Sequence, residues 1–532
     1  MVRERLFLNG DFRTMNHSAP VASAVVTAGD RIVYVGDIVG ARAYAHAGAE
    51  EIDLGGAFVA PGFIEAHNHM IGFGLTLADI DARFPTVRSI ADLCAAIGRR
   101  ATETPSGSWI LARGYDDNKL AECRHPTRQD LDAVAPSHPV FLVNGSGHMA
   151  VANSLALGLA KVGGSTASPQ GGHIVLDDAG EPTGLLQETA QELVRRQIPQ
   201  PTRDDMAQAL RRCGQHYLAA GITSSHTAGV NSADEMAAHH LVTFDGSLPL
   251  RTYLMIGRPL LGLVEDLGLR TGLGDKRLRI GPIKLFSDGS LIGRTAAVFE
   301  PFLEDPRPDN LGLEMMPQEE LDETVRRAHD AGFQVATHAI GDRAIHMVLS
   351  AYERALAANP RPDHRHRIEH CGICRPELIE RLARGRFLAV SQPIFVTEYG
   401  DGFLRHLGRE RCALTYPFRS LLNAGVDLVF SSDCPVSAYE PLKGIQAAVT
   451  EQTGSGQPYT PAEAISVEEG IRLYTIAAAR ASFEETDKGS IEVGKLADFA
   501  ILAHDPAAVE PTRIADVQVL ATVVGGATVY EA

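Results

Sequence analysis

The chain has 532 residues, 45% of them hydrophobic and 22% charged, which is the composition of a globular protein larger than one simple domain. Its net charge of −17 disfavours nucleic acid and anionic membrane as partners, and no stretch is long and apolar enough to span a membrane or act as a signal peptide. Seven cysteines, an odd number scattered along the chain, favour reduced thiols and a cytoplasmic location.

Short apolar runs separated by turn residues mark both ends of the chain. Near the N-terminus, the first run leads into a predicted turn at Asn9-Gly10. We therefore predict that residues 1–57 and 481–532 together form one small β-sandwich domain. The runs are 6–8, 24–26 and 31–36 near one end and 499–502, 517–524 and 527–530 near the other.

The middle of the chain alternates short apolar runs with helical patterns, which is typical of a parallel sheet. Helices are expected, for example, at 318–331, 344–358 and 376–384. Eight strands followed by helices predict an α/β fold, a TIM-like (β/α)₈ barrel, over residues 58–480. The predicted strands are 58–64, 222–225, 251–256, 281–286, 333–337, 366–369, 387–391 and 428–431.

The interval between the first two predicted barrel strands is far longer than an ordinary βα connection. A subdomain inserted after the first strand, at residues 75–205, accounts for it.

Candidate metal ligands stand at the carboxyl ends of the predicted strands, where barrels of this class carry their active sites. The first strand ends in His67-Asn68-His69, and because alternate residues of an extended segment face the same side, both imidazoles can bind one ion. Taken singly, each candidate has a structural interpretation, such as an ion pair for a lysine or a helix cap for an aspartate. Their common register favours a metal site. The other candidates are His226, Lys284, His338, His370 and Asp433.

Several motifs are similar to those of the amidohydrolase superfamily, and most closely to its YtcJ-like branch, amidohydrolase family 3, which includes N-substituted formamide deformylases. The most specific are the Pro-Gly-Phe segment that leads into His67 and the Gly-x-Ile tail at 489–498. One departure lies in the insertion, where Tyr115-Asp116 replaces the Trp-Asp of many relatives. The motifs are 61–69, 145–148, 284–290, 337–342, 367–370, 431–433, 489–498 and 524–526.

The resemblance implies a binuclear metal centre in which Lys284 is carbamylated and bridges two ions. An unmodified ammonium group has no lone pair and cannot be a ligand, so an unmodified Lys284 leaves a mononuclear centre. Imidazole and carboxylate ligands suit divalent ions, with zinc expected, at one or two per chain. The resemblance assigns His67, His69 and Asp433 to one ion and His338 and His370 to the other.

The resemblance also implies a mechanism. The metal lowers the pKa of bound water to about 7, and Asp433 takes the proton as the resulting hydroxide attacks a carbonyl. Asp433 then returns a proton to the leaving amine. His226 is a second candidate catalytic residue, as an oxyanion contact. Asp288 and Arg294 are expected to contact substrate or to form structural ion pairs. The predicted substrate contacts are Tyr115, Asp116, His148, Asp288 and Arg294.

These expectations predict a hydrolase that cleaves a C–N amide bond, other than a peptide bond, in a small N-acyl or N-formyl compound. A deaminase is an alternative, but the acid that deaminases usually carry three residues after the histidine of strand 5 is Gly341 here. A non-catalytic relative is another alternative, although every ligand is retained. The sequence does not fix the oligomeric state, and a homodimer is among the states it allows.

Other histidines and cysteines are expected to have no part in the site. The Cys371-x-x-Cys374 pair is interpreted as structural thiols, because no second such pair exists. His239, His240, His364 and His366 are expected to lie in surface segments.

Overall fold

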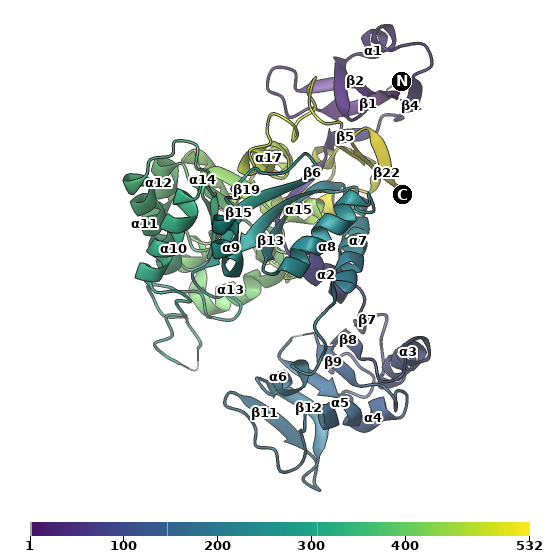
Figure 1. The fold of residues 1–532 in the computed structure, drawn as a ribbon, viewed down its shortest axis with the longest axis vertical. Coiled ribbons are helices and arrows are strands. Elements are labelled where there is room, and N and C mark those ends of the chain that lie inside the picture. The colour runs from purple at the N-terminus through teal and green to yellow at the C-terminus, as the bar shows by residue number, and fades with distance from the viewer. Residues whose placement is uncertain (1–2, 146, 306) are drawn as a thin grey trace. The chain divides into compact units, whose positions relative to one another are not determined.

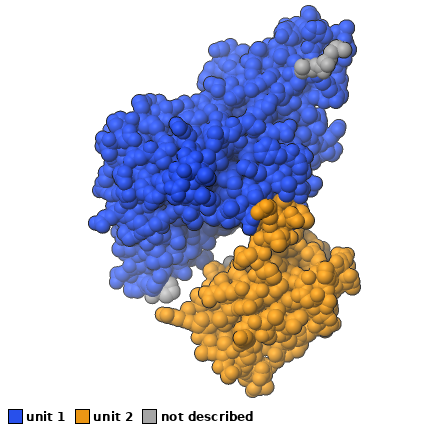
Figure 2. Space-filling model, viewed as in Figure 1, with its two compact units in different colours: residues 1–73, 210–532 blue, residues 74–209 orange. Residues whose placement is uncertain are grey.

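The computed structural model describes residues 3–145, 147–305 and 307–532. The chain divides into two compact units, shown in different colours in Figure 2. Unit 1 comprises Met1–Phe73 and Leu210–Ala532, and unit 2 comprises Gly74–Ala209. The predicted insertion at 75–205 therefore falls within unit 2.

Unit 1 contains a sheet of eight parallel strands, and all eight predicted barrel strands are found in it, in chain order. Several of them, including β6 and β14, are buried along their whole length, as expected for strands covered by helices on one side and filled by side chains on the other. The strands are β6 (Phe63–Asn68), β13 (Ile222–Val230), β14 (Arg251–Gly257), β15 (Leu278–Phe286), β16 (Val335–Ala339), β17 (Arg367–His370), β18 (Leu388–Ser391) and β19 (Asp427–Phe430).

The carboxyl ends of the first and last barrel strands are joined by backbone hydrogen bonds. The Asp433 N–H donates to the His67 carbonyl at 2.8 Å, and the His69 N–H donates to the Cys434 carbonyl at 2.8 Å. These bonds join the first strand of the sheet to the segment after the last one, at the end of the barrel where the candidate ligands lie. The predicted TIM-like barrel is thus confirmed.

Helices follow the barrel strands, and Figure 1 shows α10, α11 and α12 side by side on the outside of the barrel. The three helices predicted by range are confirmed with bounds within two residues. The helices are α2 (Met70–Thr76), α7 (Arg203–Ala219), α8 (Ala233–Phe244), α9 (Leu261–Asp266), α10 (Gln318–Asp330), α11 (Asp342–Ala358), α12 (Pro376–Gly385), α13 (Ile394–Cys412), α14 (Phe418–Asn423), α15 (Pro441–Thr450), α16 (Val467–Leu473) and α17 (Ile476–Ala481).

Both ends of the chain build one second sheet in unit 1, in the order β22-β21-β20-β5-β1-β2-β3, with β4 beside β1. A cluster of buried side chains that includes Phe7, Phe12 and Phe499 joins the two ends. The hydrogen bonds define a single continuous sheet, so its description as a sandwich stays a prediction. The strands are β1 (Glu4–Arg13), β2 (Val21–Ala28), β3 (Arg31–Gly36), β4 (Glu50–Asp53), β5 (Phe58–Pro61), β20 (Phe499–Leu502), β21 (Val519–Val524) and β22 (Ala527–Glu531), with a short helix α1 (Ile38–Tyr44).

Two local predictions in this sheet were wrong. Asn9-Gly10 is no turn, because β1 continues through it with a register shift between Leu8 and Phe12 and a φ of 56° at Asn9, as in a β-bulge. The predicted strand 58–64 is two strands. It breaks at Gly62, where any Cβ would overlap the Thr223 side chain, so that β5 belongs to the terminal sheet and β6 to the barrel.

Unit 2 has its own six-stranded mixed sheet, in the order β11-β12-β10-β9-β8-β7, and its own buried core. It is thus a separately packed module rather than a long loop. Its elements are β7 (Ile80–Asp81), α3 (Ile90–Glu103), β8 (Ile110–Tyr115), α4 (Arg128–Asp132), β9 (Val140–Asn144), β10 (Met149–Ala152), α5 (Ser154–Leu159), β11 (Gly172–Leu176), β12 (Pro182–Glu188) and α6 (Gln191–Arg195). Across the described ranges of both units, no helix has the length and apolar character that a membrane crossing requires.

Candidate metal centre

Two histidines and an aspartate converge at the closed mouth of the barrel. The ligand atoms of His67, His69 and Asp433 all lie within 4.8 Å of one another. Asp433 Oδ1 is 3.2 Å from His69 Nε2 and 3.5 Å from His67 Nε2. The backbone bonds between β6 and the segment after β19 bring these residues together, although they are far apart in the sequence.

Strand alternation explains which side chains reach this point. His67 and His69 lie two residues apart at the end of β6, while Asn68 between them points the other way and donates to Ser225 Oγ at 2.8 Å. Asp433 has a φ of 62°, a left-handed backbone conformation that is uncommon outside glycine and is often found at functional sites.

These three residues fit a divalent cation. Asp433 Oδ1 is buried and makes no hydrogen bond to any described residue, which leaves a carboxylate oxygen beside two imidazoles. Burial holds the pKa of His67 well below its usual range, so this imidazole is neutral and keeps a lone pair. Neutral imidazole and carboxylate oxygen are the ligands that zinc and similar ions take.

The structure brings the other predicted ligands to the same place. The His370 ring centroid lies 4.9 Å from that of His67 and 4.4 Å from that of His338. His370 Nδ1 donates to Gln392 Oε1 at 2.8 Å, since an amide oxygen can only accept, and its Nε2 therefore carries the lone pair. His370 and His338 thus lie beside the three clustered ligands through ring contacts. His338 Nε2 donates to the Gly289 carbonyl at 2.8 Å, which leaves the lone pair of that ring on Nδ1.

Lys284 is buried on β15 with its Nζ 3.2 Å from His67 Nε2. Among the residues that the structure describes, no carboxylate oxygen lies within 4.0 Å of this nitrogen. Burial lowers the pKa of Lys284 to about 8, because the interior disfavours the charged form. Lys284 therefore does not form an ordinary ion pair with a carboxylate.

Three charged residues around His67 were not predicted as site residues. Glu369 accepts a short hydrogen bond from His67 Nδ1, and Arg367 forms a two-point ion pair with Glu369. Glu65 Oε1 accepts from the backbone N–H groups of His67 at 3.1 Å and Ser432 at 3.0 Å. The pattern that could have identified the first two is the pair of opposite charges at alternate positions of one buried strand, β17.

His226, the second candidate catalytic residue, is buried in the barrel. Its Nδ1 accepts from Arg367 Nη1 at 3.2 Å, since a guanidinium can only donate, so the proton sits on Nε2. This Nε2 is buried and has no hydrogen-bond partner in the part of the chain that the structure describes. An unused donor in the barrel is compatible with the predicted oxyanion contact, which stays a prediction.

Asp288 and Arg294 lie in the loop that follows β15 and both make structural contacts, Asp288 also with the segment after β16. Asp288 is buried and accepts from the backbone N–H groups of Ala297, Ile340 and Gly341, so both of its oxygens stabilise the fold instead of facing a substrate. Arg294 pairs with Asp305 at 3.3 Å. Arg294 thus forms the structural ion pair of the alternative, whereas Asp288 is held by backbone hydrogen bonds and lies 3.4 Å from His338 Nε2.

The predicted substrate contacts of the insertion lie in unit 2. Tyr115 is fully buried in that unit's core with its hydroxyl 3.0 Å from His125 Nδ1, so its ring is not presented to a substrate. Asp116 is at the surface, 3.3 Å from Lys119 Nζ. His148 is exposed, 3.1 Å from Glu188 Oε2. Ser146 of the motif at 145–148 lies outside the described residues.

Of the cysteines and histidines that were expected to have no part in the site, some lie where the sequence predicted and others do not. Cys371 and Cys374 are free and buried, in accord with structural thiols. The surface placement of three histidines was wrong, because His239, His364 and His366 are all buried. His366 Nε2 lies 3.0 Å from His329 Nδ1, whereas neither ring nitrogen of His239 has a hydrogen-bond partner within residues 3–145, 147–305 and 307–532.

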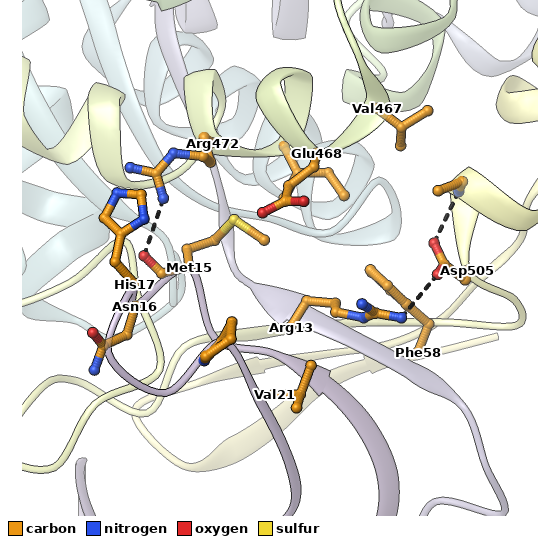
Figure 3. Close-up of a pocket in the computed structure, with 13 residues that line it drawn as sticks. Arg13, Met15, Asn16, His17, Val21, Phe58, Val467, Glu468, Arg472 and Asp505 are labelled. Carbon is orange, nitrogen blue, oxygen red and sulfur yellow. Dashed lines mark hydrogen bonds and ion pairs between the residues drawn. The ribbon is translucent and has the colours of Figure 1, made fainter.

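A separate cavity of about 220 Å³ lies between the terminal sheet and α16 (Figure 3). Arg13 and Phe58 line one side and Ile471 and Arg472 the other, and Arg472 donates to the Met15 carbonyl at 3.3 Å. None of the predicted site residues lines this cavity, so the candidate centre is the barrel mouth.

Known proteins resemble this chain along almost its whole length. The model of the amidohydrolase family matches residues 50–530. YtcJ of Bacillus subtilis (strain 168) is 32% identical over 489 residues, which cover 91% of this chain and 90% of YtcJ. The N-substituted formamide deformylase of Arthrobacter pascens is 32% identical over 542 residues, which cover 100% of this chain and 99% of the deformylase. A crystal structure of an uncharacterized metal-dependent hydrolase from Pyrococcus horikoshii OT3 superimposes with a TM-score of 0.80 at 29% identity, covering 96% of this chain and 99% of that one.

Proposed function

The chain belongs to the amidohydrolase family and is a metal-dependent hydrolase of that superfamily, and from this we propose that it cleaves a C–N amide bond of a small N-acyl or N-formyl compound. The observation that carries the proposal is the convergence of His67, His69 and Asp433 at the barrel mouth, with an unpartnered carboxylate oxygen at its centre. The formamide deformylase relative supports the choice of an amide.

His67, His69 and Asp433 would hold one divalent ion, which we propose is zinc, and His338 and His370 would contribute to a second. Such an ion polarises a carbonyl and makes water a stronger nucleophile at neutral pH. We propose that Lys284 carries a carbamate, because a buried lysine without a carboxylate partner is free to react with carbon dioxide. The carbamate would supply the oxygens that an ammonium lacks.

The proton transfers fall to Asp433. It accepts a proton from the water that attacks the amide carbon and delivers one to the amine nitrogen as the C–N bond breaks, so that the products are an acid and an amine. Its position beside His67 and His69 supports this role, because the ion that these residues would hold would also bind the carbonyl. His226 Nε2 is our candidate donor to the oxyanion, and we keep Asp116 and His148 as proposed substrate contacts.

Deamination is disfavoured by the segment after His338. Gly341 stands at the position of the expected acid, and the carboxylate of the next residue, Asp342, is paired with Arg375 Nε at 2.5 Å and accepts from the Phe299 backbone N–H. Loss of catalysis is disfavoured because all six proposed ligand residues are present, and three of them bring their ligand atoms within 4.8 Å of one another.

Metal content tests the proposal directly. Protein prepared without chelator is expected to contain one to two zinc-like ions per chain by elemental analysis, because the converging ligands bind such ions tightly. Removing them with a chelator should abolish hydrolysis of N-acyl amines, and adding zinc back should restore it. A metal-free preparation that hydrolyses these substrates at an unchanged rate would contradict the proposal.

Phe286 is expected to contact an apolar part of the substrate. It lies two residues after Lys284 on β15 and is 44% exposed, yet its ring is 5.3 Å from that of His338 and 4.7 Å from Lys284 Nζ. Removing the ring from this position beside the proposed ligands should therefore weaken binding of large apolar substituents.

Phe286→Ala should raise KM several-fold for N-benzyl or N-aryl amides but leave KM for N-methylformamide nearly unchanged. The matched control is Phe244→Ala, which removes an exposed ring at the end of α8. Equal changes for both substrate types would show that Phe286 does not select the substituent.

A further inference from the structure

We infer that the buried Arg367–Glu369 ion pair is a positioning device for His67, which selects the imidazole tautomer that can bind a metal. This inference rests on the proposed metal centre and assigns a function to two residues that touch no proposed ion themselves. Glu369 contacts His67, and Arg367 holds Glu369.

The tautomer of His67 follows from its two neighbours. A carboxylate can only accept, so the short contact between His67 Nδ1 and Glu369 Oε2 places the ring proton on Nδ1. Nε2 then carries the lone pair, and Lys284 Nζ, a donor, lies 3.2 Å from it. Both contacts thus agree, and the lone pair faces Asp433 Oδ1 at 3.5 Å.

Arg367 fixes Glu369 in place. Its Nε lies 2.7 Å from Glu369 Oε1 and its Nη2 lies 3.0 Å from Glu369 Oε2. The same Nη2 donates to the Ala66 carbonyl at 2.7 Å, on the strand that carries His67. Arg367, Glu369 and His67 are each 0% exposed, so water does not compete for these hydrogen bonds. The imidazole of His67 and the guanidinium of Arg367 are therefore each held in one orientation.

A buried ion pair such as Arg367–Glu369 could stabilise the fold without positioning a ligand. The chain contains another buried ion pair with which it can be compared. Arg251 and Asp498 form a second buried two-point pair, at 2.7 Å and 2.9 Å. Its further contacts are backbone atoms, the Lys276 carbonyl and the Gly525 N–H, and no histidine. The two pairs share their chemistry and burial and differ in what the carboxylate orients.

The test measures affinity for Co²⁺ and Zn²⁺ in metal-stripped full-length protein by competition with a chromophoric chelator. Glu369→Gln should weaken binding by roughly 10- to 100-fold, the usual effect of removing a partner that orients a metal-binding histidine. The glutamine oxygen would face Arg367 and its NH₂ would face His67 Nδ1, which favours the tautomer protonated on Nε2. The visible spectrum of bound Co²⁺ should change as well.

Asp498→Asn is the matched control and should lower Tm while it leaves metal affinity within about twofold of wild type, because no ligand depends on it. If Glu369→Gln does not fold, Glu369→Asp replaces it, since a shorter carboxylate withdraws from Nδ1 and should still weaken binding. Wild-type affinity in a folded Glu369 variant would overturn the inference. A wild-type protein that binds neither ion would instead overturn the proposed function, so the two failures are distinguishable.

Discussion

Replacement of Asp433 by asparagine is expected to lower kcat by roughly 10²- to 10⁴-fold, the range attributed to a positioned general acid–base group. Asparagine keeps an oxygen at the position of Oδ1, 3.2 Å from His69 Nε2, and can still act as a ligand. It cannot accept a proton from water and return it to the amine. Metal content should therefore fall far less than kcat.

The measurement pairs steady-state kinetics on an N-acyl amine with elemental analysis of the same sample. Ser437→Ala is a suitable control, because Ser437 donates to the Ser432 carbonyl in the same loop at 2.5 Å without facing His67 or His69. It should retain most activity. If Asp433→Asn kept wild-type kcat at full metal content, Asp433 would be a ligand only and another group would have to move the proton.

Lys284→Ala is expected to remove nearly all activity and part of the bound metal. Losing several kcal/mol of metal-dependent charge stabilisation corresponds to a rate decrease of roughly 100-fold or more. The substitution leaves an empty space beside His67 Nε2, which a small anion can enter. Bicarbonate or a short carboxylic acid should therefore restore part of the activity, by supplying the oxygens proposed for the carbamate.

A second buried lysine controls for the loss of a buried amine. Lys488 is paired with Glu484 at 2.8 Å and donates to Ser224 Oγ at 3.1 Å, away from the proposed ligands. Lys488→Ala should lower Tm, and carboxylic acids should not change its rate. Full activity in Lys284→Ala without added acid would show that Lys284 is no ligand and that the centre needs no bridge.

The barrel and its ligands could be predicted because their physical causes are local. Buried parallel strands read as continuous apolar runs, and ligand residues at strand ends share one register. His67 and His69 were predictable from alternation alone, since Asn68 has to face the opposite side.

The features that could not be predicted from the sequence depend on contacts between segments that are far apart along the chain. The break at Gly62 depends on Thr223 of the neighbouring strand β13, which is distant in the sequence and which no local pattern records. The contact between Glu369 and His67 could not be predicted, because the sequence places Glu369 beside His370 and only the packing of the strands brings it against His67. Asp288 resembled a pocket residue because two of its three backbone donors, Ile340 and Gly341, lie in a different segment, after β16.

The joining of β6 to the segment after β19 has a consequence for biosynthesis. Ser432 donates to Glu65 across 367 positions of the chain, and the ligands His67 and Asp433 are separated by almost the same distance. A ribosome exposes the two histidines long before it exposes the carboxylate, and contacts of such long range form late in folding. The nascent protein therefore has two imidazoles but no complete ligand set for most of its synthesis. An ion held by both imidazoles and this carboxylate therefore cannot be bound before residue 433 has been made, and a truncated chain ending before it would lack the segment that is joined to β6.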